Sequence, residues 1–156
     1  MFKAFLPQRV DNGYRGNKLA PWLFAVVVLL KVYVGFHSIF KGNVMARSGD
    51  GIPMGSLPSA GAQAVVSLYA LWGLEQIAIC VLCLLVLVRY RALIPLMFAL
   101  LLAEQLVRKL TVHLLPLSPS ATAGESVGLS PFPYGFLILI VVGLILSLRR
   151  RDDSQA

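Results

Sequence analysis

The sequence predicts an all-α integral membrane protein: a four-helix bundle with two long outer loops. Its residues are 58% hydrophobic and 13% charged, and its mean hydropathy is +0.79, whereas soluble domains are about 45–50% apolar and about 25% charged. The chain has four apolar stretches, and the second is apolar for about 27 residues, long enough to cross a hydrocarbon layer of ~30 Å. The 156 residues fit a single transmembrane domain, 1–156, with predicted spans at 20–40, 62–88, 92–115 and 132–148.

The first span, 20–40, carries a lysine near its middle. Lys31 lies about 15 Å into the helix at ~1.5 Å per residue, and Gly35 and Ser38 share its face. Small residues on that face let another helix approach closely. The preceding residues, 1–19, are predicted to form either a solvated basic tail or a segment on the membrane surface.

Residues 41–61 are predicted to form the first outer loop. Glycine, serine and proline dominate this segment, and Asp50-Gly51 predicts a turn. A connection of this length is uncommon in a compact domain, so we interpret it as a lid or a docking surface.

The second span, 62–88, contains a polar stripe. Gln76, Cys80 and Cys83 recur at spacings of 4 and 3 residues, which places them on one helix face. We predict that this face points into the bundle. Glu75 is about 100° round the helix from Gln76, at the edge of the stripe. A carboxylate at this depth costs about 2.5 kcal/mol or more, so it requires compensation.

The third span, 92–115, is polar through its outer half. Glu104 and Arg108 are predicted i,i+4 partners, as are Lys109 and His113. Such a helix is too polar to face lipid on all sides.

The last span, 132–148, has no charged residue. Gly135 and Gly143 are its predicted points of close helix approach. A second outer loop, 116–131, rich in serine, proline and glycine, is predicted to precede it.

The distribution of lysine and arginine predicts the orientation. Four lie in the N-terminal tail, two in the turn at 89–91 and three after the last span. Because cytoplasmic segments are enriched in such residues, we expect a multi-pass protein of the bacterial inner (plasma) membrane with both termini cytoplasmic. The basic residues flank apolar runs and do not alternate with aromatics, so nucleic acid is not an expected partner.

A cluster of polar side chains within the spans is the candidate ligand or proton site. In the predicted topology Lys31, Glu75 and Glu104 lie near the midplane of the bilayer. The full candidate set is Lys31, Glu75, Gln76, Glu104, Arg108, Lys109 and His113. These charges either form a site or pair with one another only to fix helix packing. No catalytic residue is assigned.

Cys80 and Cys83 have the CxxC spacing of redox proteins. That motif works at a helix N-terminus, where the dipole lowers the thiol pKa, but here it lies inside an apolar helix. The pair is interpreted as packing residues or, alternatively, as a thiol pair that cycles. No metal site is predicted, because further soft ligands are lacking.

Two segments, LLKVYVGFHSIFKG (29–42) and GLEQIAICVLCLLVLVRYRALIPLMFA (73–99), resemble the DoxX-like family of small bacterial membrane proteins. Lys31, Gly35 and Lys41 match its first span, although arginine is usual at the first of these positions. Glu75 and Arg89 match its second span, while cysteine and alanine stand where the family has glycines. The resemblance implies four transmembrane helices and an association with membrane redox enzymes, some of which pass electrons to quinone.

The sequence thus favours an accessory or redox-linked membrane subunit that is not an enzyme on its own. Its polar cluster would bind a small ligand or a quinone headgroup, and quinone is the only cofactor that the resemblance suggests. The alternatives are a purely structural subunit of a larger membrane complex and a proton or solute conduit. The expected partners are the lipid bilayer and other membrane-protein subunits.

Overall fold

The computed structural model describes residue 14, residues 16–114 and residues 131–149. The described chain is built from helices, as predicted. Four of them are long and one is a single turn: α2 (Leu19–Phe40), α3 (Gly42–Val44), α4 (Ser59–Arg89), α5 (Ile94–Leu114) and α6 (Pro131–Leu148). A 3-10 turn at Arg91–Leu93 joins α4 to α5. The four predicted apolar stretches are therefore confirmed as helices, with ends that differ by up to three residues from the expected 20–40, 62–88, 92–115 and 132–148.

Local sequence explains where the helices begin. Just before α2, the Asn17 side chain accepts a hydrogen bond of 3.0 Å from the Leu19 amide, one of the amides that has no partner within the helix. Pro58 directly precedes α4, and Pro95 lies in the first turn of α5. A proline is tolerated at these positions because the amide it lacks would have no partner in the helix.

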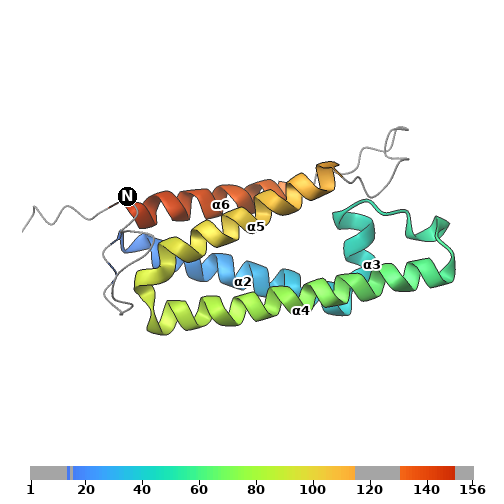
Figure 1. Cartoon of the computed structure of the whole chain (residues 1–156), viewed down its shortest axis with the longest axis horizontal. Coiled ribbons are helices and arrows are strands. Elements are labelled where there is room, and N and C mark those ends of the chain that lie inside the picture. Colours follow the sequence, from blue (N-terminus) through green and yellow to red (C-terminus); the bar gives the residue numbers. More distant parts are fainter. Residues whose placement is uncertain (1–13, 15, 115–130, 150–156) are drawn as a thin grey trace, which may run out of the picture.

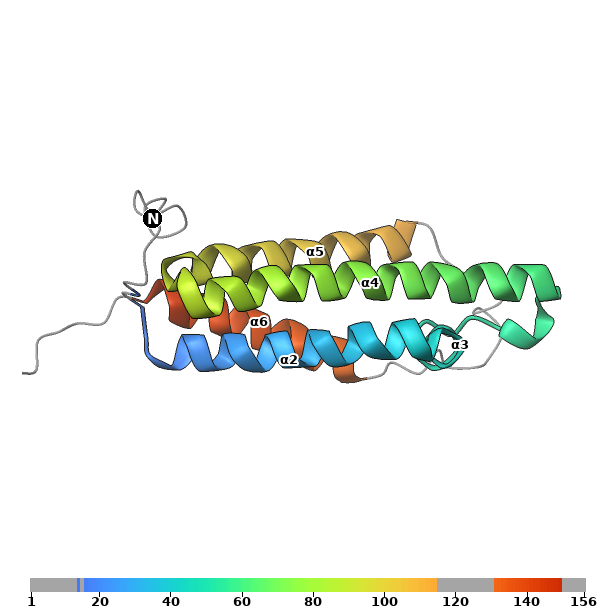
Figure 2. The same cartoon turned by 90° about the horizontal axis from the view of Figure 1, so that it is seen from below.

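The four long helices lie lengthwise beside one another, and the chain reverses direction between them (Figures 1 and 2). The start of α2, the α4–α5 turn and the end of α6 therefore lie at one end of the molecule. At the opposite end α3 packs against α4, and α4 extends beyond the other helices.

The closest helix crossing joins α2 to α4 through two glycines. A Cβ atom added at Gly73 would lie 2.6 Å from the carbonyl oxygen of Gly35. A Cβ added at Gly35 would lie 2.9 Å from Cδ1 of Ile77. Gly73 thus requires glycine because it meets backbone, whereas at Gly35 the end of the Ile77 side chain would have to shift. The predicted close approach on the Lys31 face of the first span is confirmed.

The apolar core lies toward the end that holds the α4–α5 turn. Phe24 and Phe98 form an edge-to-face pair with ring centroids 5.1 Å apart. Gly143 of α6 leaves room for Phe98, since a Cβ there would lie 2.4 Å from its ring. Among the described residues nothing lies within 4 Å of a Cβ added at Gly135, so the close approach expected there is not seen in this part of the chain.

Large apolar side chains are exposed on all four long helices. Examples are Leu29 (68% exposed) on α2, Leu71 (63%) on α4, Val107 (62%) on α5 and Ile138 (63%) on α6. Helices α2 and α4 are long and apolar enough to cross a membrane, and α6 has a shorter apolar stretch. Length and composition thus weakly suggest a membrane protein.

The first outer loop is ordered by short helical turns. After α3 come a π-helical turn, Met45–Gly49, and a 3-10 turn, Met54–Ser56. Gly51 has a φ of 67°, so the predicted turn at Asp50-Gly51 places a glycine where the backbone requires one. The second predicted loop, 116–131, lies outside the described residues apart from Pro131, which begins α6.

Candidate functional site

Three side chains from three helices form a buried polar network. The ammonium of Lys31 on α2 donates to both carboxylate oxygens of Glu104 on α5, at 2.7 and 2.9 Å. The amide of Gln76 on α4 donates to Oε1 of Glu104 at 2.9 Å. Lys31 is 2% exposed and Gln76 3%. This Lys31–Gln76–Glu104 network, hereafter the polar core, confirms that the marked polar faces of the first three spans meet.

Helix periodicity explains how the polar core is positioned. Lys31 lies one turn before Gly35 on the same face of α2. Gln76 lies almost one turn after Gly73 on α4. The glycine crossing therefore brings the two polar side chains together and leaves Glu104 to reach them from α5.

Glu75 does not belong to the polar core. Its side chain is exposed on the outer surface of α4, and within the described part of the chain it makes no hydrogen bond or ion pair. Adjacent helical residues point about 100° apart, so the burial of Gln76 turns Glu75 outward. The expected triad of Lys31, Glu75 and Glu104 is corrected to one ion pair and an amide.

A second polar group lies between the polar core and the first outer loop. The hydroxyl of Tyr69 donates a hydrogen bond to the carboxylate of Asp50, and Arg108 contacts the same carboxylate at 3.3 Å. The Arg108 guanidinium lies 4.1 Å from the ring centroid of Trp72. These residues, hereafter the outer cluster, tie the loop to α4 and α5.

The predicted pairs within α5 are replaced by contacts to other elements. Glu104 pairs with Lys31 and not with Arg108, which pairs with Asp50. The Lys109 ammonium lies 4.0 Å from the ring centroid of Tyr134 on α6, and the His113 side chain is exposed. Contacts between helices thus prevail over the i,i+4 pairs, which are worth only a few tenths of a kcal/mol.

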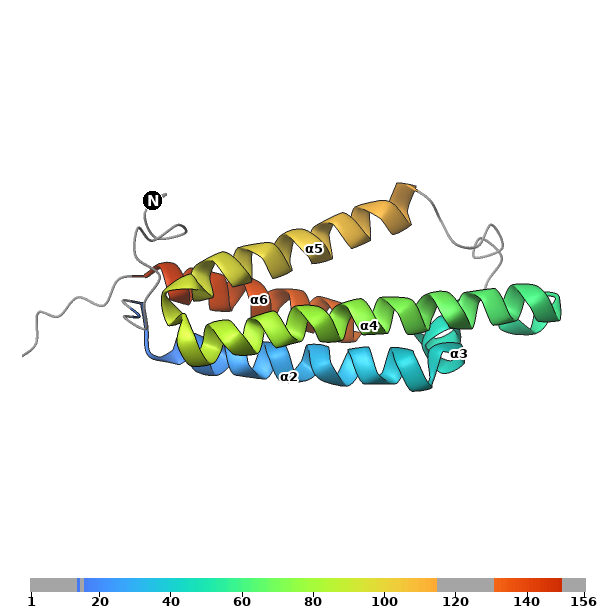
Figure 3. The ribbon, with the colours of Figure 1, turned by 60° about the horizontal axis from the view of Figure 1, so that its bottom comes forward.

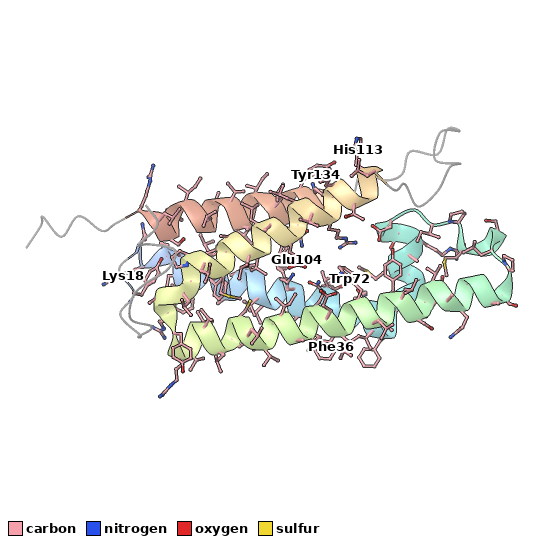
Figure 4. The ribbon with its side chains drawn as sticks, viewed as in Figure 1. Lys18, Phe36, Trp72, Glu104, His113 and Tyr134 are labelled. Atoms are coloured by element: carbon pink, nitrogen blue, oxygen red, sulfur yellow. The ribbon has the colours of Figure 1, made fainter. Side chains whose placement is uncertain are left out.

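Residues of the polar core and of the outer cluster are partly exposed on the side of the molecule between α4 and α5. Helix α5 diverges from α4 toward its C-terminal end (Figure 3). Glu104 and Trp72 point into the space between the two helices (Figure 4). The side chains of Glu104 and Arg108 remain 26% and 37% exposed. We call this side of the molecule the α4–α5 face.

No family model, curated protein or solved structure matches this chain. The DoxX-like resemblance therefore stays a prediction.

Both cysteines face the apolar core. Cys80 is 1% exposed and Cys83 0%, and both are free thiols. They pack among core side chains that include Phe24, Val28 and Phe98. The inward orientation predicted from their spacing with Gln76 is confirmed, and their surroundings fit a packing role.

Asp50 was not among the predicted site residues. It lies in the first outer loop, where helical periodicity gives no direction for a side chain. The available signal was charge. Glu104 is the one acidic residue near Arg108 in the third span, and Asp50 is the one acidic residue of the 41–61 segment.

Proposed function

We propose that the chain is an integral membrane protein whose four long helices cross the bilayer and enclose the polar core. The observation that carries this proposal is the distribution of polarity: the buried Lys31 pairs between the helices with Glu104, while large apolar side chains are exposed on all four helices. Water-soluble proteins rarely expose contiguous apolar surface on this scale, whereas intramembrane charges normally face the interior of a bundle and pair there.

The proposed location is the inner membrane of a bacterium, with both termini cytoplasmic. In support, exposed basic side chains mark the end of the molecule that holds the α4–α5 turn: Lys18, Arg89, Arg91 and Arg149. Basic residues favour the cytoplasmic side. The outer cluster would then face the outer half of the bilayer.

Within this membrane protein, the α4–α5 face is the proposed binding site for a quinone headgroup, in an accessory or redox-linked subunit. Trp72 and Tyr69 offer aromatic surface, and the partly exposed Arg108 offers donors for a carbonyl oxygen. The partial exposure of Glu104 and Arg108 supports access from the side, which a lipid-soluble ligand requires.

Tryptophan fluorescence tests this site, because the chain has only two tryptophans. Trp22 is 76% exposed and lies in the first turn of α2, away from the α4–α5 face. Its replacement by Trp22→Phe leaves Trp72 as the single reporter. In lipid nanodiscs, titration with a short-chain benzoquinone is expected to quench Trp72 with a saturable curve, and Arg108→Leu is expected to weaken binding roughly tenfold by removing a charged donor.

The matched control is Trp72→Phe, which leaves only Trp22. Its quenching should rise linearly with quinone, as expected for partition into lipid without a site. Linear quenching of Trp72 as well would contradict a quinone site.

A second candidate, a purely structural subunit, is favoured by the completeness of the polar core. Both Glu104 oxygens are engaged by Lys31, and one also by Gln76, so no ligand is needed to balance the buried charges. Under this candidate, Trp72 quenching is linear, while mild-detergent purification retains a stoichiometric protein partner.

A further inference from the structure

Glu75 is a carboxylate on an otherwise apolar helix surface. Around Glu75 the exposed residues of α4 are apolar: Leu68, Leu71, Leu74, Ala78, Val81, Leu82, Leu84 and Leu85; the exposed Ser67 lies at the end of this stretch. Glu75 lies about 21 Å along α4 from Arg89, at ~1.5 Å per residue. At the proposed orientation this is well inside a hydrocarbon layer of ~30 Å, too deep for its short side chain to reach the interface.

No basic side chain of the described residues compensates this carboxylate. Lys31 is buried against Glu104, Arg108 contacts Asp50, and Lys109 lies over Tyr134 on α6. The remaining basic side chains lie toward the two ends of the helices. An unpaired carboxylate facing lipid is costly, so a cation beyond the described residues is needed to compensate it.

We propose that the surface of α4 centred on Glu75 docks a transmembrane helix of another protein, one that presents a lysine or arginine at mid-membrane depth. The inference rests on the proposed membrane location. The leucines around Glu75 supply apolar contact and Ala78 permits close approach one turn away. The charge pair fixes the register of the two helices, because a shift by one turn would separate the charges by ~5 Å.

A second copy of the chain does not meet this requirement. It would bring another Glu75 to the same depth, together with the same basic side chains, which in the described residues are engaged or lie near the helix ends. Two carboxylates facing each other repel unless one takes up a proton. The charge pattern therefore selects a basic partner over self-association.

Model transmembrane peptides test this docking. The full chain is reconstituted in phosphatidylcholine vesicles with a leucine-alanine peptide that carries one central lysine and a dye excited by tryptophan emission. All chains carry Trp22→Phe, so that Trp72, three residues from Glu75, serves as the single energy donor. The lysine peptide is expected to associate roughly tenfold more tightly than a peptide with leucine at the same position.

Two variants with surface substitutions complete the experiment. Glu75→Gln keeps the side-chain size and should abolish the preference for lysine. Leu82→Gln adds an amide to the same exposed stripe and should leave the preference intact. Equal binding of the two peptides to the unaltered chain, or a lysine preference that survives Glu75→Gln, would overturn the proposal.

Two further measurements on the same vesicles separate the remaining outcomes. Energy transfer between copies labelled at their amino termini reports self-association; if it is strong and Glu75→Gln removes it, a second copy is the partner and the proposal is overturned. Resistance of the chain to carbonate extraction reports insertion. If the unaltered chain is inserted but shows no preference for the lysine peptide, only the docking proposal is contradicted. If carbonate extracts the chain, both the membrane proposal and the docking that rests on it are contradicted.

Discussion

Glu104 receives every hydrogen bond of the polar core. Lys31 donates to both of its carboxylate oxygens, and Gln76 donates to one of them. Lys31 is almost fully buried, at 2% exposure, so its charge depends on Glu104 for compensation. Loss of one partner from such a pair is more damaging than loss of both, because a lone buried charge remains.

This asymmetry predicts the behaviour of substitutions at the ion pair. Glu104→Leu is expected to lower the free energy of unfolding by about 3–5 kcal/mol. Lys31→Met combined with Glu104→Leu should recover most of that loss. Unfolding in mixed detergent micelles, followed by tryptophan fluorescence, measures both. A double variant as unstable as the sum of the single variants would show that the pair contributes through packing and not through charge.

At the residue scale, helical spacing predicted some partners and missed others. Lys31, Gln76 and Glu104 were placed on inward faces because each falls on a face marked by other small or polar residues. Glu75 was assigned to the same cluster, since a position at the edge of a stripe turns inward or outward with a small rotation of the helix. Asp50 was missed, because the direction of a loop side chain depends on tertiary packing.

At the scale of elements, the α2–α4 crossing determines how closely the polar core assembles. Gly73→Ala would place a methyl group 2.6 Å from the Gly35 carbonyl oxygen, which is backbone and cannot rotate away. We expect it to lower the free energy of unfolding by about 1–3 kcal/mol, although alanine is otherwise the better helix former by about 1 kcal/mol.

The matched control for this prediction is Gly135→Ala on α6, where no described residue lies within 4 Å of the added atom. The free energy of unfolding of the Gly135→Ala variant should be unchanged or slightly raised. Equal effects of the two substitutions, measured by the same detergent unfolding, would contradict a tight crossing at Gly73.

The long apolar runs predicted the four long helices, but nothing in the sequence predicted the structure of the first outer loop. Glycine and proline predicted an irregular connection over 41–61, but this segment holds three short helical turns, at 42–44, 45–49 and 54–56. Turns this short carry no periodic pattern that sequence reasoning can detect. Contacts of the loop with α4 stabilise them, as at Gly42, where an added Cβ would lie 3.2 Å from Cβ of Tyr69.

At the scale of the whole molecule, polarity is distributed along two axes. Across the helices, the buried polar core contrasts with exposed leucines and valines. Along the helices, exposed basic side chains gather at the end with the α4–α5 turn, while Lys41 and Arg47 are the exposed basic residues of the first loop. The apolar composition predicted apolar surfaces with polar groups inside. The count of lysines and arginines predicts which end of the helices lies on the cytoplasmic side.

Cysteine labelling in spheroplasts of an expressing bacterium tests most directly whether the helices cross the membrane in this orientation. The buried Cys80 and Cys83 are first replaced by alanine, and then a single cysteine is introduced by Asn43→Cys at one end or Arg149→Cys at the other; both positions are exposed. A membrane-impermeant maleimide is expected to label the Asn43→Cys protein in intact spheroplasts and the Arg149→Cys protein only after lysis. Labelling of both variants before lysis, or of Arg149→Cys alone, would contradict the proposed orientation of the four helices.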